Sequence, residues 1–183
     1  MCPMKLDVRA LLAGESRSLP IDILLPFSAD SQDTKTTIGD FTFDGPITVK
    51  GEILNTAGYL RLTATLEAAY TTFCARCLDE VKGVFSFPFE RTVSTRKQLS
   101  DLPEEALDDY VLADDGYIVL DDLLLEFFEL SLPLRTLCRE DCLGLCHHCG
   151  KNLNQGACDC ASTEVDPRLA PLQKWLAEHK EEE

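Results

Sequence analysis

The sequence predicts an α+β fold: an antiparallel, mainly β body with one buried helix, a C-terminal cysteine-rich zinc module and a short terminal helix. Three observations predict it: alternating apolar and polar residues in the first half, an apolar stripe at helical spacing in an acidic stretch, and clustered cysteines. We expect a β-rich body over residues 1–134. A zinc-knuckle module with the terminal helix follows over residues 135–183 and packs on the body through Cys74 and Cys77.

The first strands are expected where short apolar pieces occur, at residues 5–12 and 21–25, separated by a turn region at 14–18. Residues 28–37 are polar and predict a loop. The segment 26–44 as a whole has the weakest pattern. The pattern does not decide whether the sheet is open or closes into a barrel.

Strong period-two alternation begins at residue 47. Apolar and polar residues alternate over 47–54 and 60–68, on either side of an Asn-Thr-Ala-Gly turn at 55–58, and again over 85–89. Such alternation places one face of a strand on a core and the other in solvent. The short turns favour an antiparallel meander.

Residues 99–134 contain no lysine or arginine and carry most of the net negative charge. The eleven acidic residues of this acidic stretch are Asp101, Glu104, Glu105, Asp108, Asp109, Asp114, Asp115, Asp121, Asp122, Glu126 and Glu129. A buried helix is expected over about 119–131, with Leu124, Phe127, Phe128 and Ser131 on one face. Asp121 or Asp122 is expected to cap it, and Pro133 to mark its end.

A second helix is expected near the C-terminus. Asp166 suits the N-cap and Pro167 the first helical position. Leu169, Leu172 and Leu176 would then share one face.

Composition and charge restrict the function. The 183 residues are 45% hydrophobic and 27% charged, which excludes collagen-like, coiled-coil and wholly disordered chains. Against 32 acidic residues there are only 17 lysines and arginines, giving a formal net charge of −15. A general nucleic-acid binder requires the opposite sign. Any RNA contact must therefore be local or made through a basic protein partner.

The N-terminus does not match a secretory signal, and no apolar run approaches the length of a membrane span. We therefore expect a cytoplasmic protein. In that compartment, clustered cysteines indicate metal or redox sites rather than disulfides. Cys2 stands apart from the clusters and is interpreted as an incidental thiol.

Eight of the nine cysteines are clustered, at Cys74, Cys77, Cys138, Cys142, Cys146, Cys149, Cys158 and Cys160. C-x-x-C turns direct two sulfurs at one point, and two such pairs surround Zn²⁺. The sequence therefore predicts two structural zinc ions. The preferred grouping places Cys74 and Cys77 with Cys138 and Cys142, and the remaining four together.

The first of these groups would close a long loop, so its loss should destabilise the fold more than loss of the second, local group. His147 or His148 could replace a sulfur ligand, but the complete C-x-x-C favours cysteine. Gly150 directly follows the last C-x-x-C and suits a tight turn with positive φ. Arg76, Lys82, Arg135, Arg139 and Lys151 lie near in sequence and could offset the thiolate charge.

Several enzyme readings fit less well. Cys142, Cys146 and Cys149 have radical-SAM cluster spacing, but the expected aromatic is missing and too little chain follows for a barrel. Iron–sulfur ferredoxin spacings do not match, and a zinc deaminase needs an H-x-E segment that the chain lacks. Phosphate-loop, dinucleotide and G-x-S-x-G motifs are also missing. Four sulfurs leave no open metal position for water, so we expect no enzyme.

The sequence resembles the YceD family, the large ribosomal RNA subunit accumulation proteins. Together with the acidic middle, the resemblance spans roughly the whole chain. It rests on Cys74-x-x-Cys77, on the string from Leu132-Pro133 through Cys142-x-Gly144-Leu145-Cys146-x-x-Cys149-Gly150-x-Asn152-Leu153-Asn154 to Cys158-x-Cys160, and on Asp166-Pro167-Arg168-Leu169.

This resemblance implies a role in 23S rRNA accumulation and large-subunit assembly, without known catalytic residues. The expected partner is a large-subunit precursor, reached through a basic ribosomal protein bound by the acidic surface or through local rRNA contact. A zinc-linked thiol redox sensor or a general protein-interaction module is the alternative. The oligomeric state is not readable from the sequence.

Overall fold

The computed structural model describes residues 5–27, 35–99, 103, 109–160, 168–169, 171–172 and 174–175. Most of the expected terminal helix from Asp166 lies outside these residues. So do Cys2 and four members of the acidic stretch, Asp101, Glu104, Glu105 and Asp108. Within the described part, no helix is both long and apolar enough to cross a membrane.

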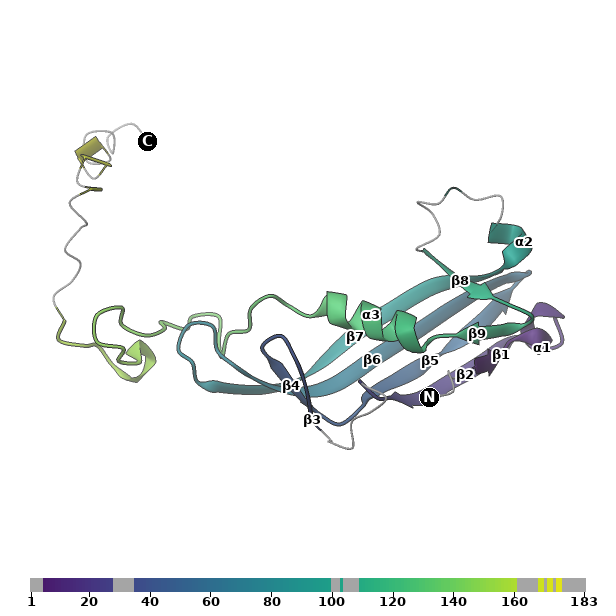
Figure 1. The fold of residues 1–183 in the computed structure, drawn as a ribbon, viewed down its shortest axis with the longest axis horizontal. Helices are drawn as coiled ribbons and strands as arrows, with labels where there is room; N and C mark the ends of the chain where they lie inside the picture. Colours follow the sequence, from purple (N-terminus) through teal and green to yellow (C-terminus); the bar gives the residue numbers. More distant parts are fainter. Residues whose placement is uncertain are drawn as a thin grey trace.

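The described elements are nine strands, three α-helices and one 3₁₀ turn (Figure 1). The strands are β1 (Lys5–Asp7), β2 (Ser18–Leu25), β3 (Lys35–Ile38), β4 (Phe41–Asp44), β5 (Ile47–Thr56), β6 (Tyr59–Phe73), β7 (Glu80–Thr95), β8 (Tyr110–Ala113) and β9 (Tyr117–Val119). The helices are α1 (Arg9–Leu12), α2 (Arg96–Leu99), α3 (Asp121–Ser131) and the 3₁₀ turn η2 (Leu153–Gln155).

The sheet is built around β6. This strand pairs antiparallel with β5 along its first part, with β4 near its end, and with β7 on its other side. The β6–β7 hairpin runs in register from Leu60↔Val93 to Phe73↔Glu80, so it forms a long arm with a turn at its tip. Among the described strands, the sheet does not close into a barrel, because β2 pairs only with β5 and β8 only with β7.

The predicted alternation is confirmed in the central strands. Leu60, Leu62 and Leu66 of β6 are buried, whereas Arg61 and Glu67 are exposed on the opposite face. The turn that joins β5 to β6 is also as expected. Its central residues have φ values of 54° and 93°, which matches the right-handed twist of a tight hairpin.

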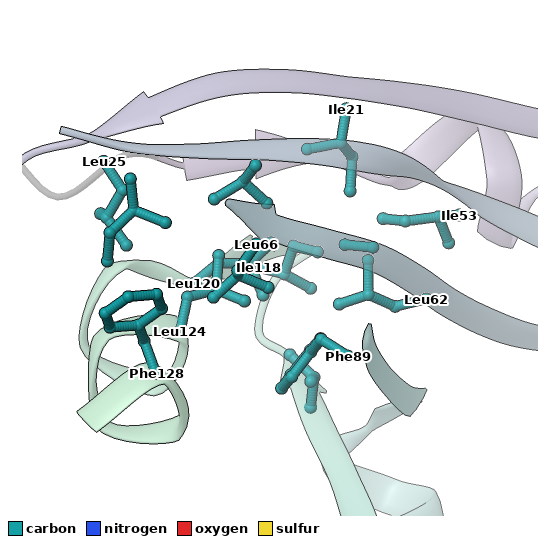
Figure 2. Close-up of a cluster of buried hydrophobic side chains, with 14 of the residues drawn as sticks. Ile21, Leu25, Ile53, Leu62, Leu66, Phe89, Ile118, Leu120, Leu124 and Phe128 are labelled. Carbon is teal, nitrogen blue, oxygen red and sulfur yellow. The ribbon is translucent and has the colours of Figure 1, made fainter. Parts of the chain in front are cut away.

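Helix α3 covers the apolar face of this sheet (Figure 1, Figure 2). Leu124 and Phe128 are fully buried. The Phe128 ring packs edge-on against Phe27 at 5.6 Å, and against Phe43 and Phe87 at 5.5 Å each. The predicted helix and its apolar face are confirmed, and the helix ends before Pro133 as expected, with Leu132 in an extended conformation.

The predicted cap of this helix is wrong. The N-cap position is Leu120, which makes no side-chain capping hydrogen bond. Asp121 and Asp122 lie instead in the first helical turn. Carboxylates in a first turn stabilise the helix through the positive end of its dipole. The two aspartates therefore mark the start of the helix correctly, although neither occupies the N-cap position.

The acidic stretch contains more regular structure than the sequence analysis expected. Strand β8 pairs parallel with β7, and β9 pairs antiparallel with β1, forming a separate two-stranded sheet. Val111, Ala113 and Ile118 are buried. These strands are so short that only one or two inward residues mark each of them, and the surrounding aspartates obscure the pattern.

Two further expectations at the N-terminal side are corrected. The apolar piece 5–12 is not one strand but β1 followed by α1, whose Leu11 is buried. The polar segment 28–37 is not loop throughout, because β3 begins at Lys35 and pairs with β4. Strand β3 is polar apart from its last residue, so alternation could not reveal it.

The packing of α3 gives a test of the fold. We predict that Phe128→Ala lowers the free energy of unfolding by about 3–5 kcal/mol, because it removes a ring that is buried among three others. The matched control is Leu130→Ala on the same helix, where the side chain is 80% exposed and the expected change is within about 0.5 kcal/mol. Urea unfolding followed by circular dichroism measures both. Equal losses in the two variants would contradict this packing.

Candidate metal centres

The structure gathers the eight clustered cysteines into two groups of four. In each group the Sγ atoms all lie within 4.8 Å of one another. The first group is Cys74, Cys77, Cys138 and Cys142, and the second group is Cys146, Cys149, Cys158 and Cys160. This is the grouping that the sequence analysis preferred.

The first group lies at the tip of the β6–β7 hairpin, where the chain after α3 passes. The Sγ atoms of Cys74 and Cys142 are 3.8 Å apart, and those of Cys77 and Cys138 are 3.6 Å apart. The Ala75 backbone N–H also donates to the Thr136 carbonyl at 2.9 Å. Three of the four cysteines are buried, and Cys138 is exposed. The group therefore fastens the hairpin tip to a distant part of the chain.

The second group is local. Its Cys146 and Cys149 form one turn, and Cys158 and Cys160 return to it after a short loop. The Cys146 and Cys158 Sγ atoms are 3.3 Å apart. Cys146 is buried, whereas Cys149 is exposed and the other two are half-buried.

The two C-x-x-C turns have the same backbone design. In each, the N–H of the residue after the second cysteine donates to the carbonyl of the first: Leu78 to Cys74 at 3.0 Å and Gly150 to Cys146 at 2.8 Å. Both donors have positive φ, 61° at Leu78 and 72° at Gly150. The predicted glycine turn is confirmed at the second group, while the first adopts it with a leucine.

Backbone N–H groups also favour thiolates at these turns. Burial opposes ionisation of Cys74, but backbone hydrogen bonds, among them one from Cys138, outweigh it and lower its pKa to about 6. The backbone N–H of Cys149 is the main cause that lowers the pKa of Cys146 to about 6. Cys160 behaves in the opposite way, because its hydrogen bond to the Cys149 sulfur raises its pKa to about 12. Each group thus contains a thiol that ionises readily. Ionisation of all four thiols in a group would require a bound cation to balance their negative charge.

The geometry and chemistry of both groups fit Zn²⁺. Four sulfurs at about 2.3 Å around one ion stand about 3.8 Å apart from one another. The sulfur pairs given above approach this spacing and are far from the roughly 2.05 Å of a disulfide. Neither group contains a histidine: His147 and His148 are exposed, with their rings 4.1 Å apart.

Three of the five nearby basic residues donate hydrogen bonds around these sites. The Arg76 guanidinium donates to the Cys142 carbonyl at 2.8 Å, and Lys151 Nζ donates to the Ala157 carbonyl at 2.6 Å. Arg139 donates to the Asn154 side chain. Lys82 pairs instead with Glu80 on β7, and Arg135 lines a cavity beside the hairpin tip.

Sequence reasoning missed three polar residues that surround the first group. Asp79 accepts a hydrogen bond from the Cys77 thiol at 3.3 Å, and Asn154 Nδ2 donates to the Cys142 sulfur at 3.3 Å. Asn152 Nδ2 donates to Asp79 at 2.9 Å. Both asparagines lie between cysteine pairs in the sequence, and polar residues at such positions were a usable signal.

Comparison with known proteins gives a family match. The family described as "Large ribosomal RNA subunit accumulation protein YceD" matches residues 62–176, which include all eight clustered cysteines. An uncharacterized protein of Mycobacterium tuberculosis is 31% identical over 121 residues, 63% of this chain and 55% of its own length. One from Mycobacterium leprae is 28% identical over 142 residues, 72% of this chain and 60% of its own length.

The chain thus spans little more than half the length of these relatives. No solved structure shows a significant match to the chain.

The shared turn design predicts different effects of two substitutions. Gly150→Ala introduces a side chain at positive φ without any steric contact, so we predict a loss of about 1 kcal/mol in local stability. Leu78→Gly relieves the same strain, and we expect no loss of local stability. Hydrogen exchange of the amides at positions 150 and 78 measures both. A loss of protection for Leu78→Gly as large as that for Gly150→Ala would show that the turns differ.

Proposed function

The chain belongs to the YceD family, and from this premise we propose that it is a non-catalytic factor that supports 23S rRNA accumulation and large ribosomal subunit assembly in the cytoplasm. The observation that carries the proposal is the family match over residues 62–176, which contains both cysteine groups. The family description ties the match to the large ribosomal RNA. The acidic character of the chain then limits how it can take part.

The proposal includes two structural zinc ions, one in each cysteine group. Its support is the convergence of four sulfurs in each group and the N–H groups that favour their thiolates. Such a site supplies a fixed junction between chain segments. Four sulfur ligands leave no position for a reactive water, which supports a structural rather than a catalytic role.

Zinc content tests this part. We predict that native mass spectrometry of the purified chain finds two Zn²⁺ per molecule, because each group offers four ligands. The double variants Cys74→Ser/Cys77→Ser and Cys146→Ser/Cys149→Ser should each retain one. A wild-type chain that carries no zinc, or only one ion, would overturn the two-site proposal.

The proposed partner surface is acidic and lies on the outside of α3. Asp122, Glu126 and Glu129 are exposed and follow one another at spacings of four and three, so they form a stripe opposite the buried face of the helix. Asp114 and Asp115 add charge at the β8–β9 turn, although Asp114 also pairs with Arg96 at 3.1 Å. A stripe of one sign attracts a basic partner and fixes its orientation.

A basic ribosomal protein suits this surface better than direct contact with rRNA. Arg76, Arg139 and Lys151 donate hydrogen bonds within the module, which occupies part of their capacity for phosphate. Two zinc ions with eight thiolates would add further negative charge to the same region. We therefore propose that the chain reaches the large-subunit precursor through a basic protein.

Charge reversal on α3 tests the surface. We predict that Glu126→Lys/Glu129→Lys lowers the ratio of 23S to 16S rRNA in cells that contain only this variant, because the stripe loses its attraction for a basic partner. The helix itself should persist, since the new cation at position 129 lies in its last turn, where positive charge is favourable.

The matched control is Glu52→Lys/Glu67→Lys, which makes the same change of charge at exposed positions on the opposite face of the sheet. This variant should maintain the wild-type ratio. If both variants maintain it, the acidic stripe only solubilises the protein.

A zinc-linked redox sensor remains the second candidate, because each group has one exposed cysteine, Cys138 or Cys149. In that case hydrogen peroxide would oxidise a pair of thiolates, accepting one electron from each sulfur and two protons from solvent. The products would be a disulfide, two waters and released zinc. Zinc that stays bound in dilute peroxide would exclude this role.

A further inference from the structure

We propose that the two cysteine groups form one coupled metal unit, in which metal in the second group helps the first group to retain its own metal. The proposal rests on the metal binding proposed above and adds a dependence between the sites. Its basis is a single loop, residues 150–157. The second group closes this loop, while the side chains of the loop contact the first group.

The loop belongs to the second group by its ends. It begins directly after Cys149 and ends directly before Cys158, both members of that group. Within it, the Lys151 carbonyl accepts from the Cys146 backbone N–H at 2.8 Å, and the Lys151 side chain closes on the Ala157 carbonyl. Metal bound by the second group would therefore fix both ends of the loop.

The same loop reaches the first group through two amide side chains. Asn154 Nδ2 donates to the Sγ of Cys142, a member of the first group. Asn152 Nδ2 donates to the Asp79 carboxylate, which in turn accepts from the Cys77 thiol. One hydrogen-bond donor of the loop therefore acts directly on a sulfur of the first group, and another holds the carboxylate that lies beside Cys77.

The orientation of Asn154 follows from its other partners. Its Oδ1 accepts from the backbone N–H of Leu143 at 2.9 Å and from Arg139 at 2.6 Å, so the NH₂ end must face the sulfur. Asn152 Oδ1 accepts from the Asn154 backbone N–H at 3.0 Å and from its side chain at 2.9 Å. The two amides thus hold each other in the donating position.

A backbone path runs in parallel with the side chains. The Leu145 N–H donates to the Arg76 carbonyl in the first turn, and the Leu153 N–H of the loop donates to the Gly144 carbonyl. Gly144 has a φ of 76°, and a Cβ there would stand 3.1 Å from the Arg76 carbonyl oxygen. The loop, the Gly144 segment and the first turn therefore lie against one another with little room for adjustment.

This contact has a predictable consequence for metal binding. Hydrogen-bond donors to ligating groups change metal affinity by about 10–100-fold. If the loop is held only when the second group has metal, the first group loses the Asn154 donor to Cys142 when the second group is empty. Binding free energies couple reciprocally, so metal in the first group should stabilise metal in the second by the same factor.

The test measures metal release separately at each group. The full chain is loaded with Zn²⁺ and treated with excess EDTA, while pulses of iodoacetamide label cysteines that have lost metal. Mass spectrometry of the peptides then assigns release to each group. In Cys158→Ser/Cys160→Ser, we expect the first-group cysteines to be labelled at least about 10-fold faster than in wild type.

Asn154→Asp separates the donor from the loop anchor. The aspartate keeps an oxygen for Leu143 and Arg139 but replaces the donor to Cys142 with an acceptor. We expect faster labelling of the first group while circular dichroism stays unchanged. Gln155→Ala, an exposed position in the same loop, is the control and should behave as wild type.

Two results would overturn the account, and they are distinguishable. If the wild type binds two zinc ions but first-group labelling is unchanged in both Cys158→Ser/Cys160→Ser and Asn154→Asp, the coupling alone is refuted. A wild-type chain with no bound zinc and immediate labelling of all eight cysteines would refute the metal proposal itself.

Discussion

The meeting of four sulfur atoms at the tip of the β6–β7 hairpin is the constraint on which the arrangement of the molecule depends. Cys74 and Cys142 are 68 residues apart, and the chain between them forms β7, α2, β8, β9 and α3. Joining these ends requires the hairpin to extend beyond the core and α3 to lead its chain along the sheet toward the tip (Figure 1). The first group therefore lies at the end of the sheet body, where the hairpin tip meets the chain that follows α3. The second group follows directly in the chain.

The features predicted from the sequence are those in which one chemical signal repeats. Alternation over 47–68 marked the central strands, and the apolar stripe marked α3. Paired cysteines marked both groups, because C-x-x-C places two sulfurs at one point whatever surrounds it. Two features without such a repeat were not predicted correctly. Strands β8 and β9 are too short to show a repeating pattern, and the N-cap of α3 is Leu120, one position before the first aspartate.

The residues around the cysteine groups show a different limit. Asn152 and Asn154 are close in sequence to the second group but act on the first, so spacing alone assigns them to the wrong site. Their role follows only from how the loop folds back on Gly144 and the first turn. The sequence showed that this stretch is acidic, but not where the acidic stripe on α3 lies. Only the helix geometry brings its members onto one exposed face.

The central claim is that this chain supports the large ribosomal RNA and needs its metal module to do so. The most direct measurement is the ratio of 23S to 16S rRNA in cells depleted of the protein and then supplied with either wild type or Cys146→Ser/Cys149→Ser. The account predicts a selective fall of 23S on depletion, restored by wild type but not by the variant. An unchanged ratio on depletion, or full restoration by the variant, would contradict it.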